Sequence, residues 1–227
     1  MLVSLRSGEG EERRRASELV SRVYWEPVYR HLRLRWRKTP EESSDLTQEF
    51  FAMALEKECL ATYDEEKGRF RAFLKTCLDR FVQNADKAAR RIKRGGSRPA
   101  HVDLQAIEAD IESGSKNPEE LYEGEFDRAF AASLLEAGVQ DLERSLTEKG
   151  KRMHYELFRR YVLSEEAERP TYGALASELG LKETDVTNHL AYARRELRRI
   201  LIENLRELTT SDEEFELEAR TVLGMTS

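Results

Sequence analysis

The chain of 227 residues has two cysteines, five prolines and no long apolar run. Cys59 and Cys77 both fall inside apolar helical patterns without a histidine at ligand spacing, so we expect buried, reduced thiols rather than a disulfide or a metal site. No stretch approaches the roughly twenty apolar residues of a membrane span, and the N-terminal segment lacks an apolar signal core. These absences predict a soluble, cytoplasmic protein that does not bind a membrane.

Histidines are also few, and they are scattered. The sequence has four, His31, His101, His154 and His189, and no two stand at a metal-ligand spacing. There is no nucleophile elbow and no phosphate-cradling glycine loop, since the glycine pair at 95–96 ends a basic helical stretch. We therefore expect no catalytic residue, no metal and no cofactor, and we interpret the chain as something other than an enzyme.

Charge is abundant and unevenly distributed. Charged residues make up 36% of the chain, and the formal net charge is −6. A nucleic-acid-binding protein with this net charge has to separate its charges, because attraction to a polyanion depends on the local sign. Residues 30–38 and 87–98 are rich in arginine and lysine, whereas residues 103–127 are acidic. The two basic runs are therefore candidate contacts with a polyanion.

Apolar residues recur at helical spacing along the chain, and no useful length alternates with period two. The sequence therefore predicts an all-α protein. Pro27 predicts a kinked or two-part first helix, and Gly138 predicts a break in a long later one. The helices are expected at residues 16–36, from Pro40 with Thr39 as N-cap, from Phe70, from Pro118, at 153–162, as a pair within 170–200, and after a Ser211 cap.

Residues 170–200 have the spacing of a helix-turn-helix. Thr171 is placed as an N-cap, Ala176 is small where two helices must approach, and Gly180 can adopt the positive φ that ends the first helix. The second helix is expected from about Glu183, with polar side chains suited to base edges on its early turns and a basic run after them. A helical hairpin that only packs is the structural alternative. The candidate DNA contacts are Thr184, Thr187, Asn188, His189, Arg194, Arg195 and Arg198.

The composition predicts two helical domains. Residues 18–95 and 119–208 carry the helical patterns, and the acidic, polar residues 96–118 are interpreted as a linker between them. A polar tail at 1–17 precedes the first domain. An acidic extension at 209–227 follows the second, and the sequence assigns no role to it.

Four stretches occur in an order typical of one protein family: YWEPVYRHL at residues 24–32, DLTQEFF at 45–51, GRFRAFL at 68–74, and the helix-turn-helix. In this order the chain resembles bacterial RNA polymerase sigma factors of the extracytoplasmic-function type, group IV. The resemblance implies that residues 18–95 form the promoter-melting domain (region 2). It also implies that the helix-turn-helix domain, over about residues 128–205, binds the upstream promoter element (region 4).

The resemblance also implies roles for particular residues. Asp45, Gln48 and Glu49 would bind the clamp helices of the polymerase β′ subunit. The loop at residues 63–69 would face unpaired bases, and the helix-turn-helix residues would contact the minus-thirty-five element. The minus-ten element would be contacted by Arg80, Gln83, Asn84, Lys87, Arg90 and Arg91.

The chain departs from the family pattern at several positions. Lys182 stands where a serine N-cap is usual, and Thr187 and His189 replace residues that are commonly basic. Ser44 occupies the position just before the DLTQE run where an acid is usual, and Ser43 precedes it. We hypothesise that phosphorylation of Ser43, Ser44 or Thr47 restores this charge and switches on polymerase binding. The alternative is that a serine is simply tolerated on the surface of a helix.

The sequence therefore predicts a sigma factor that directs promoter-specific transcription initiation. Its expected partners are core RNA polymerase and promoter DNA, with an anti-sigma factor or a Ser/Thr kinase as a further candidate. One alternative is a helix-turn-helix regulator that acts without joining polymerase. Another is a sigma-like decoy, which would bind polymerase without opening promoters.

Overall fold

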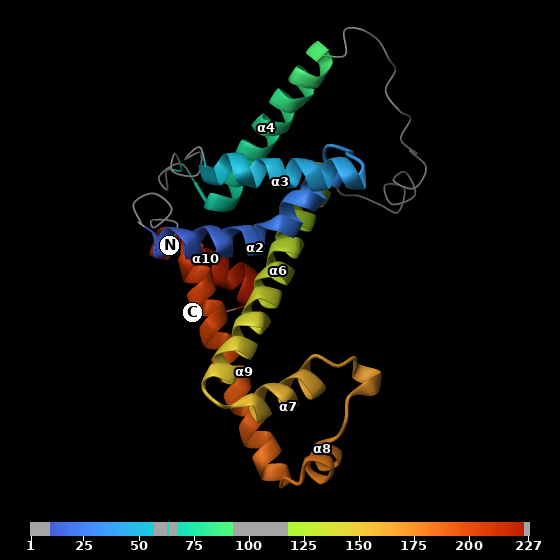
Figure 1. Cartoon of the computed structure of the whole chain (residues 1–227), viewed down its shortest axis with the longest axis vertical. Helices are drawn as coiled ribbons and strands as arrows, with labels where there is room; N and C mark the ends of the chain where they lie inside the picture. Colours follow the sequence, from blue (N-terminus) through green and yellow to red (C-terminus); the bar gives the residue numbers. More distant parts are fainter. Residues whose placement is uncertain (1–9, 57–62, 64–67, 93–117, 225–227) are drawn as a thin grey trace. The chain divides into compact units, whose positions relative to one another are not determined.

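The structure is a computed structural model that describes residues 10–56, 63, 68–92 and 118–224, with the backbone alone described at 56, 87–92 and 118–123. This part of the chain is helical and contains no strand, so the all-α prediction is confirmed (Figure 1). The linker expected at 96–118 lies outside the described residues apart from Pro118. The elements are α2 (Glu11–Leu34), α3 (Pro40–Glu56), α4 (Phe70–Ile92), α6 (Pro118–Glu148), α7 (Arg152–Val162), η4 (Glu166–Glu168), α8 (Tyr172–Leu179), α9 (Glu183–Glu207) and α10 (Asp212–Leu223).

The chain divides into two compact units, but not at the expected linker. The first unit comprises residues 1–133 together with 207–227, and the second comprises residues 134–206. The first turns of α6 and the C-terminal segment therefore belong with α2, α3 and α4, whereas the sequence analysis placed them in the second domain and in a separate extension.

In the first unit α2 is one helix, not two. It runs through Pro27, which has no N–H to donate to the preceding turn. Burial of Leu19, Val23 and Val28 on the core face keeps the helix continuous on both sides of the proline. Packing therefore outweighs the local preference of proline to end a helix.

Local capping fixes where α3 begins. The Thr39 hydroxyl accepts a hydrogen bond from the Glu42 N–H at 3.2 Å, and the Glu42 carboxylate accepts one from the Thr39 N–H at 2.9 Å. This reciprocal capping box confirms the predicted start at Pro40. The helix packs on α2 and on α4, with Phe50 and Ala54 in the core.

Aromatic rings join α2, α4 and α6 in the core of the first unit. The Tyr24 ring lies 5.6 Å from the Phe70 ring and 5.0 Å from the Phe130 ring, measured between centroids. Phe126 lies 6.5 Å away on the same side of α6. The residues of α6 before position 134 are therefore part of this core.

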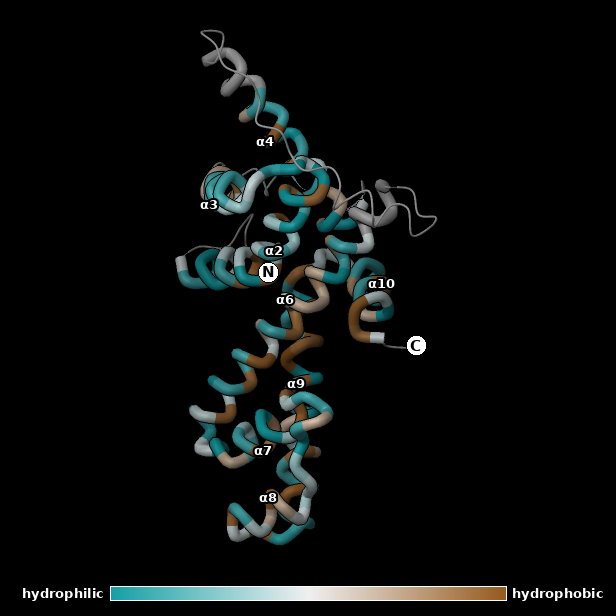
Figure 2. The backbone as a smooth tube through the Cα atoms, turned by 90° about the vertical axis from the view of Figure 1, so that its right-hand side faces the viewer, coloured by the Kyte–Doolittle hydropathy of each residue, from teal (hydrophilic) through white to brown (hydrophobic). Residues whose placement is uncertain are grey.

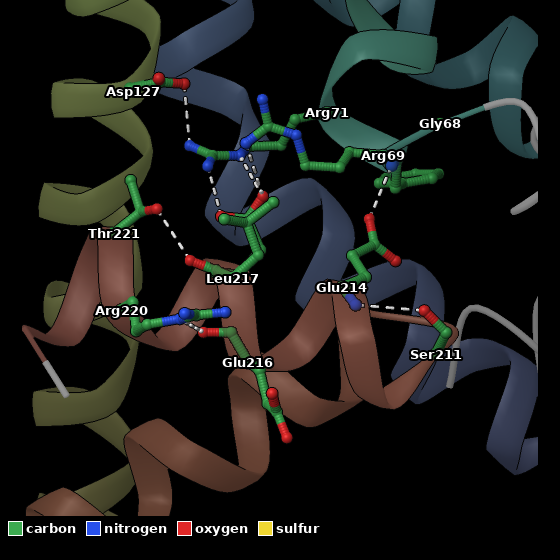
Figure 3. A network of polar contacts seen from close by, with 12 residues as sticks. Gly68, Arg69, Arg71, Asp127, Ser211, Glu214, Glu216, Leu217, Arg220 and Thr221 are labelled. Carbon is green, nitrogen blue, oxygen red and sulfur yellow. Dashed lines mark hydrogen bonds and ion pairs between the residues drawn. The ribbon is translucent and has the colours of Figure 1, made fainter. Parts of the chain in front are cut away.

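The C-terminal helix α10 is bound to the start of α4. Ser211 caps it by accepting a hydrogen bond from the Glu214 N–H at 3.1 Å, as the sequence predicts. The buried Glu214 carboxylate accepts a hydrogen bond from the Phe70 N–H at 2.7 Å. Glu218 pairs with Arg71, which also donates to Asp127 at 2.8 Å (Figure 3). The extension is therefore an integral part of the first unit.

The second unit contains the predicted helix-turn-helix. The Thr171 hydroxyl accepts a hydrogen bond from the Ala174 N–H at 3.1 Å and caps α8, and Gly180 ends it with φ 65°. Leu157 and Phe158 of α7 share one apolar cluster with residues of α8 and α9, so α7 packs on the motif as expected. The central residues of this cluster are Leu157, Phe158, Leu175, Ala176, Val186 and Leu190.

Helix α6 continues through Gly138, so the predicted break there is wrong. A Cβ at this position would lie 2.5 Å from Leu201 Cδ2 and 3.4 Å from Leu197 Cδ1. The glycine therefore permits a close approach of α6 and α9 rather than a turn.

Polar residues recur along α2, α3 and α4 (Figure 2). Among the described residues, no helix combines the length and the apolar character needed to cross a membrane. Cys77 is half-buried and is not part of a disulfide, and Cys59 lies outside the described residues.

Candidate nucleic-acid interface

Six of the seven candidate DNA contacts on α9 share one exposed face, here called the α9 stripe. Positions three, four and seven residues apart lie on the same side of a helix, which aligns these residues over about 21 Å. The stripe consists of Thr184, Thr187, Asn188, Arg194, Arg195 and Arg198, all exposed. Its first half carries hydroxyl and amide groups, and its second half carries guanidinium groups.

The start of α9 is capped in an unusual way. Lys182 stands at the N-cap position and cannot accept a hydrogen bond with its side chain. Asp185 compensates, because its carboxylate accepts a hydrogen bond from the Lys182 N–H at 3.1 Å. The Lys182 side chain itself is exposed.

Aromatic rings lie under two arginines of the stripe. The guanidinium carbon of Arg194 lies 5.9 Å from the centre of the Tyr161 ring, and that of Arg195 lies 5.4 Å from the Tyr192 ring. Such contacts restrain an arginine without using its N–H donors. Both guanidinium groups therefore stay available for phosphates.

The neighbouring Arg199 is occupied instead. It forms ion pairs with Glu196 and Glu203 on its own helix. Hydrogen bonds from Arg199 and Lys149 lower the pKa of Glu196 to about 2, so this acid stays ionised. Arg198, one residue earlier, is exposed and has no ion pair within the described part of the chain. Arg198 is therefore available to a ligand, whereas Arg199 stabilises the helix.

His189 does not belong to the stripe. It is half-buried, and its Nδ1 lies 3.1 Å from Nε2 of His154 on α7. Burial lowers the pKa of His154, and the nearby His189 and Lys151 lower it further. In this structure His189 thus makes a contact between helices, and its DNA contact stays a prediction.

On α4, the described part of the minus-ten set is exposed: Arg80, Gln83 and Asn84 all face solvent. Lys87, Arg90 and Arg91 lie on the last turns of the same helix, where only the backbone is described. Of the loop expected to face unpaired bases, Tyr63 is only 4% exposed, and its hydroxyl donates to the Gly68 carbonyl at 2.8 Å. Tyr63 therefore supports the core and does not point outward.

Three polar side chains form one exposed face of α3. Asp45, Gln48 and Glu49 have the spacing of one side of a helix, and all three are exposed. Phe50 and Phe51 are buried on the opposite side and hold the helix in place.

The three candidate phosphorylation sites differ sharply in exposure. Ser43 and Thr47 are fully buried, and the Thr47 hydroxyl donates to the Ser43 carbonyl at 2.7 Å. A phosphate on either side chain would have to enter the core, so the geometry disfavours both. Ser44 is exposed and is the one of the three that a kinase can reach in this conformation.

The structure also brings together a set of residues that the sequence analysis did not connect. Trp36 Nε1 donates to Asp79 Oδ1 at 2.8 Å, and Nε2 of His31 lies 2.9 Å from the same oxygen. Burial alone would raise the pKa of Asp79, but these hydrogen bonds and the nearby Arg35 lower it below its ordinary value. His31 and Trp36 lie more than forty positions from Asp79 in the chain. The basic run at 30–38 is the one sequence feature that could have indicated an acidic partner for this segment.

Compared with models of protein families, with curated proteins and with solved structures, the chain gives no match. Within the described residues, no group of three or more His, Cys, Asp or Glu side chains is arranged to hold a metal ion. The functional interpretation therefore depends on the surfaces of α3, α4 and α9.

Proposed function

We propose that the chain is a sigma factor, the promoter-specificity subunit of bacterial RNA polymerase. It binds core polymerase through the exposed face of α3 and promoter DNA through α4 and α9. The order of the sequence motifs and the exposure of these three surfaces support the proposal. The observation that carries it beyond DNA binding is the exposed face formed by Asp45, Gln48 and Glu49.

On duplex DNA, the α9 stripe divides into two parts. The hydroxyl and amide groups of Thr184, Thr187 and Asn188 match donors and acceptors on base edges in a major groove. The guanidinium groups of Arg194 and Arg195 suit phosphates, which position a protein but carry no sequence information. The early turns of α9 would thus recognise the DNA base sequence, and its middle turns would contribute affinity for the DNA backbone.

On opened DNA, α4 has a different role. Strand separation exposes bases that must be unstacked and then held by cations and polar groups. Arg80, Gln83 and Asn84 present a cation and two amides on one helix. Held against the displaced strand, they would stabilise the open state without nucleotide hydrolysis.

Run-off transcription with core polymerase on a library of genomic fragments tests the proposal. We expect specific start sites that depend on the chain. Replacing Asp45, Gln48 and Glu49 together by alanine should weaken polymerase binding at least tenfold while leaving duplex binding unchanged. The matched control is Glu166→Ala with Glu168→Ala, which removes the same number of negative charges from exposed positions of η4. Equal polymerase affinity of the triple variant and this control would reject the assignment of α3.

The α9 stripe by itself also favours a second function, that of a helix-turn-helix regulator acting without polymerase. This alternative predicts specific duplex footprints, no start sites in the run-off reaction and no co-purification with core polymerase. A decoy would instead bind polymerase and yield no transcripts. The one reconstituted reaction therefore separates all three functions.

Phosphorylation at Ser44 is part of the proposal, because its exposed hydroxyl lies next to Asp45. A phosphate there would add negative charge to the α3 face. Polymerase affinity is expected to rise in Ser44→Glu, and equal affinity of the variant and the wild type would remove phosphorylation from the proposal.

A further inference from the structure

Two histidines of the second unit meet between α7 and α9. His154 lies in the first turn of α7 and His189 in the second turn of α9, 35 positions away in the chain. Leu157 and Leu190, which are close to the two histidines in sequence, belong to the buried apolar cluster that packs α7 on α9. The expectation of no metal followed from spacing along the chain alone, whereas the fold creates a pair that this spacing does not indicate.

The facing nitrogens of the pair have the separation of two ligands of one metal ion. Nδ1 of His189 lies 3.1 Å from Nε2 of His154. Two imidazole nitrogens that each bind the same Zn²⁺ at about 2.0–2.1 Å lie roughly 2.9–3.4 Å apart, for bond angles of about 90–110°. The observed separation therefore fits a shared ion.

A direct hydrogen bond explains the contact between the rings less well. The ring centres lie 4.1 Å apart, and the ring planes meet at 52°. In a straight N–H···N bond both nitrogens lie on the line between the ring centres, which would then be about 5.4 Å apart. The N–H of one ring and the lone pair of the other therefore cannot both point along the line between the nitrogens. A cation beside the pair can accept a lone pair from each ring.

The pair is accessible to solvent. Both histidines are half-buried rather than enclosed in the core. Nδ1 of His154 is buried and has no hydrogen-bond partner within the described residues, so this ring can bind a ligand through Nε2. In the part of the chain that the structure describes, no third His, Cys, Asp or Glu completes a group that could hold a metal. Water would therefore fill the remaining coordination positions.

The charge near the pair is that of Lys151, the residue before α7. Its Nζ lies 3.8 Å from the centre of the Tyr192 ring, and the Tyr192 ring lies 5.0 Å from the His154 ring. The contact with the aromatic ring holds the ammonium group near the histidines. A positive charge there repels a divalent cation, so Lys151 lowers the affinity of the pair for a metal.

We propose that Nε2 of His154 and Nδ1 of His189 together bind one divalent transition-metal ion of the zinc type. Imidazole is a preferred ligand of such ions, whereas Mg²⁺ and Ca²⁺ prefer oxygen. The ion would join α7 to α9, the helix that carries the α9 stripe, and would thereby stabilise the second unit. The site goes beyond the proposed function and does not depend on it.

Isothermal titration of the full chain with zinc chloride at pH 7.5 tests the site. We expect one Zn²⁺ to bind through the pair, and His154→Gln and His189→Gln should each weaken this binding at least tenfold. The matched control is His101→Gln, which removes a histidine outside the pair and should leave the zinc affinity unchanged. Magnesium chloride is the probe for hard cations, and the two glutamine variants should not alter its binding.

Two further measurements separate metal binding from a purely structural contact. Lys151→Gln removes the repelling charge, so its zinc affinity should rise about threefold, a gain that a misfolded variant could not show. Excess zinc should raise the melting temperature of the wild type relative to its metal-free form, because a ligand that binds the folded state stabilises it. It should not raise that of His154→Gln.

Either of two results would overturn the site. One is the absence of zinc binding by the wild type. The other is an equal zinc affinity of the wild type and both glutamine variants, which would place the bound ion elsewhere on the chain. Run-off transcription does not enter these measurements, so the metal site and the sigma factor proposal succeed or fail separately.

Discussion

At the scale of single residues, contacts decide which members of a charged run are functional candidates. Arg198 and Arg199 are neighbours of identical chemistry, yet one faces solvent and the other is bound to Glu196 and Glu203. His189 was grouped with its polar neighbours by sequence, but it contacts His154. A side chain is available to DNA only where the fold gives it no nearer partner.

The histidine pair predicts a pH dependence of stability in the second unit. Burial, His189 and Lys151 lower the pKa of His154 below its ordinary value of 6.5. As the pH falls through 6.5, the unfolded chain takes up this proton first, so the folded state loses stability. The stabilisation is complete above that pH and declines below it.

Chemical denaturation at pH 7.5 and pH 5.5 measures this effect. We expect a lower midpoint at pH 5.5 in the wild type and a smaller difference in His154→Gln. The groups that face His154 are His189, Lys151 and Tyr192. An equal pH difference in the two proteins would contradict the prediction.

At the scale of secondary-structure elements, α10 is held by buried charge. Arg71 is 5% exposed and Glu218 is 3% exposed, and each is the other's ion-pair partner (Figure 3). The Arg71 guanidinium also lies 4.7 Å from the centre of the Phe130 ring. Neutralising Glu218 would leave the buried Arg71 guanidinium with the half-exposed Asp127 as its carboxylate partner, and losing one partner of a buried ion pair costs more than the pair contributes as a whole.

Replacing Glu218 by glutamine should therefore destabilise the first unit by about 3 kcal/mol. The control is Glu216→Gln on the exposed side of the same helix, where the change should stay within about 0.5 kcal/mol. Urea denaturation of both variants, followed by tryptophan fluorescence, gives the two values. A Glu218 variant as stable as the control would show that α10 contributes little to the unit.

The sequence predicted these elements well where the determinants are local. Thr39, Thr171, Ser211 and Gly180 each act within four residues, and all four end or begin helices as predicted. The failures concern partners far apart in the chain. The sequence around Gly138 does not predict its contact with Leu201, and the sequence around Arg71 does not predict its ion pair with Glu218. Helix caps can be predicted from a few consecutive residues, whereas contacts between residues far apart in the chain can be identified only from the folded structure.

At the scale of the whole molecule, the first unit is discontinuous in sequence. Residues 1–133 and 207–227 form it together, and residues 134–206 form the other. The predicted boundary followed composition, because the acidic stretch at 96–118 has the polar character of a linker. Composition does not reveal that the helix after such a stretch packs back on the residues before it.

Fragments test this division. Residues 134–206 contain their own apolar cluster, so we expect this fragment to be helical and to unfold cooperatively when isolated. Residues 1–133 alone should show a less cooperative transition, and adding a peptide of residues 207–227 should sharpen it. Circular dichroism during heating distinguishes the fragments. A cooperative 1–133 fragment that ignores the peptide would contradict the prediction.

The pairing of Arg71 with Glu218 has a consequence for biosynthesis. The two residues are 147 positions apart, so a ribosome adding about 5–20 residues per second needs roughly 7–30 s to make the second after the first. During that interval Arg71 and the Phe70 amide have no partner from α10. The ribosome therefore completes residues 134–206 before α10 can pack on the rest of the first unit.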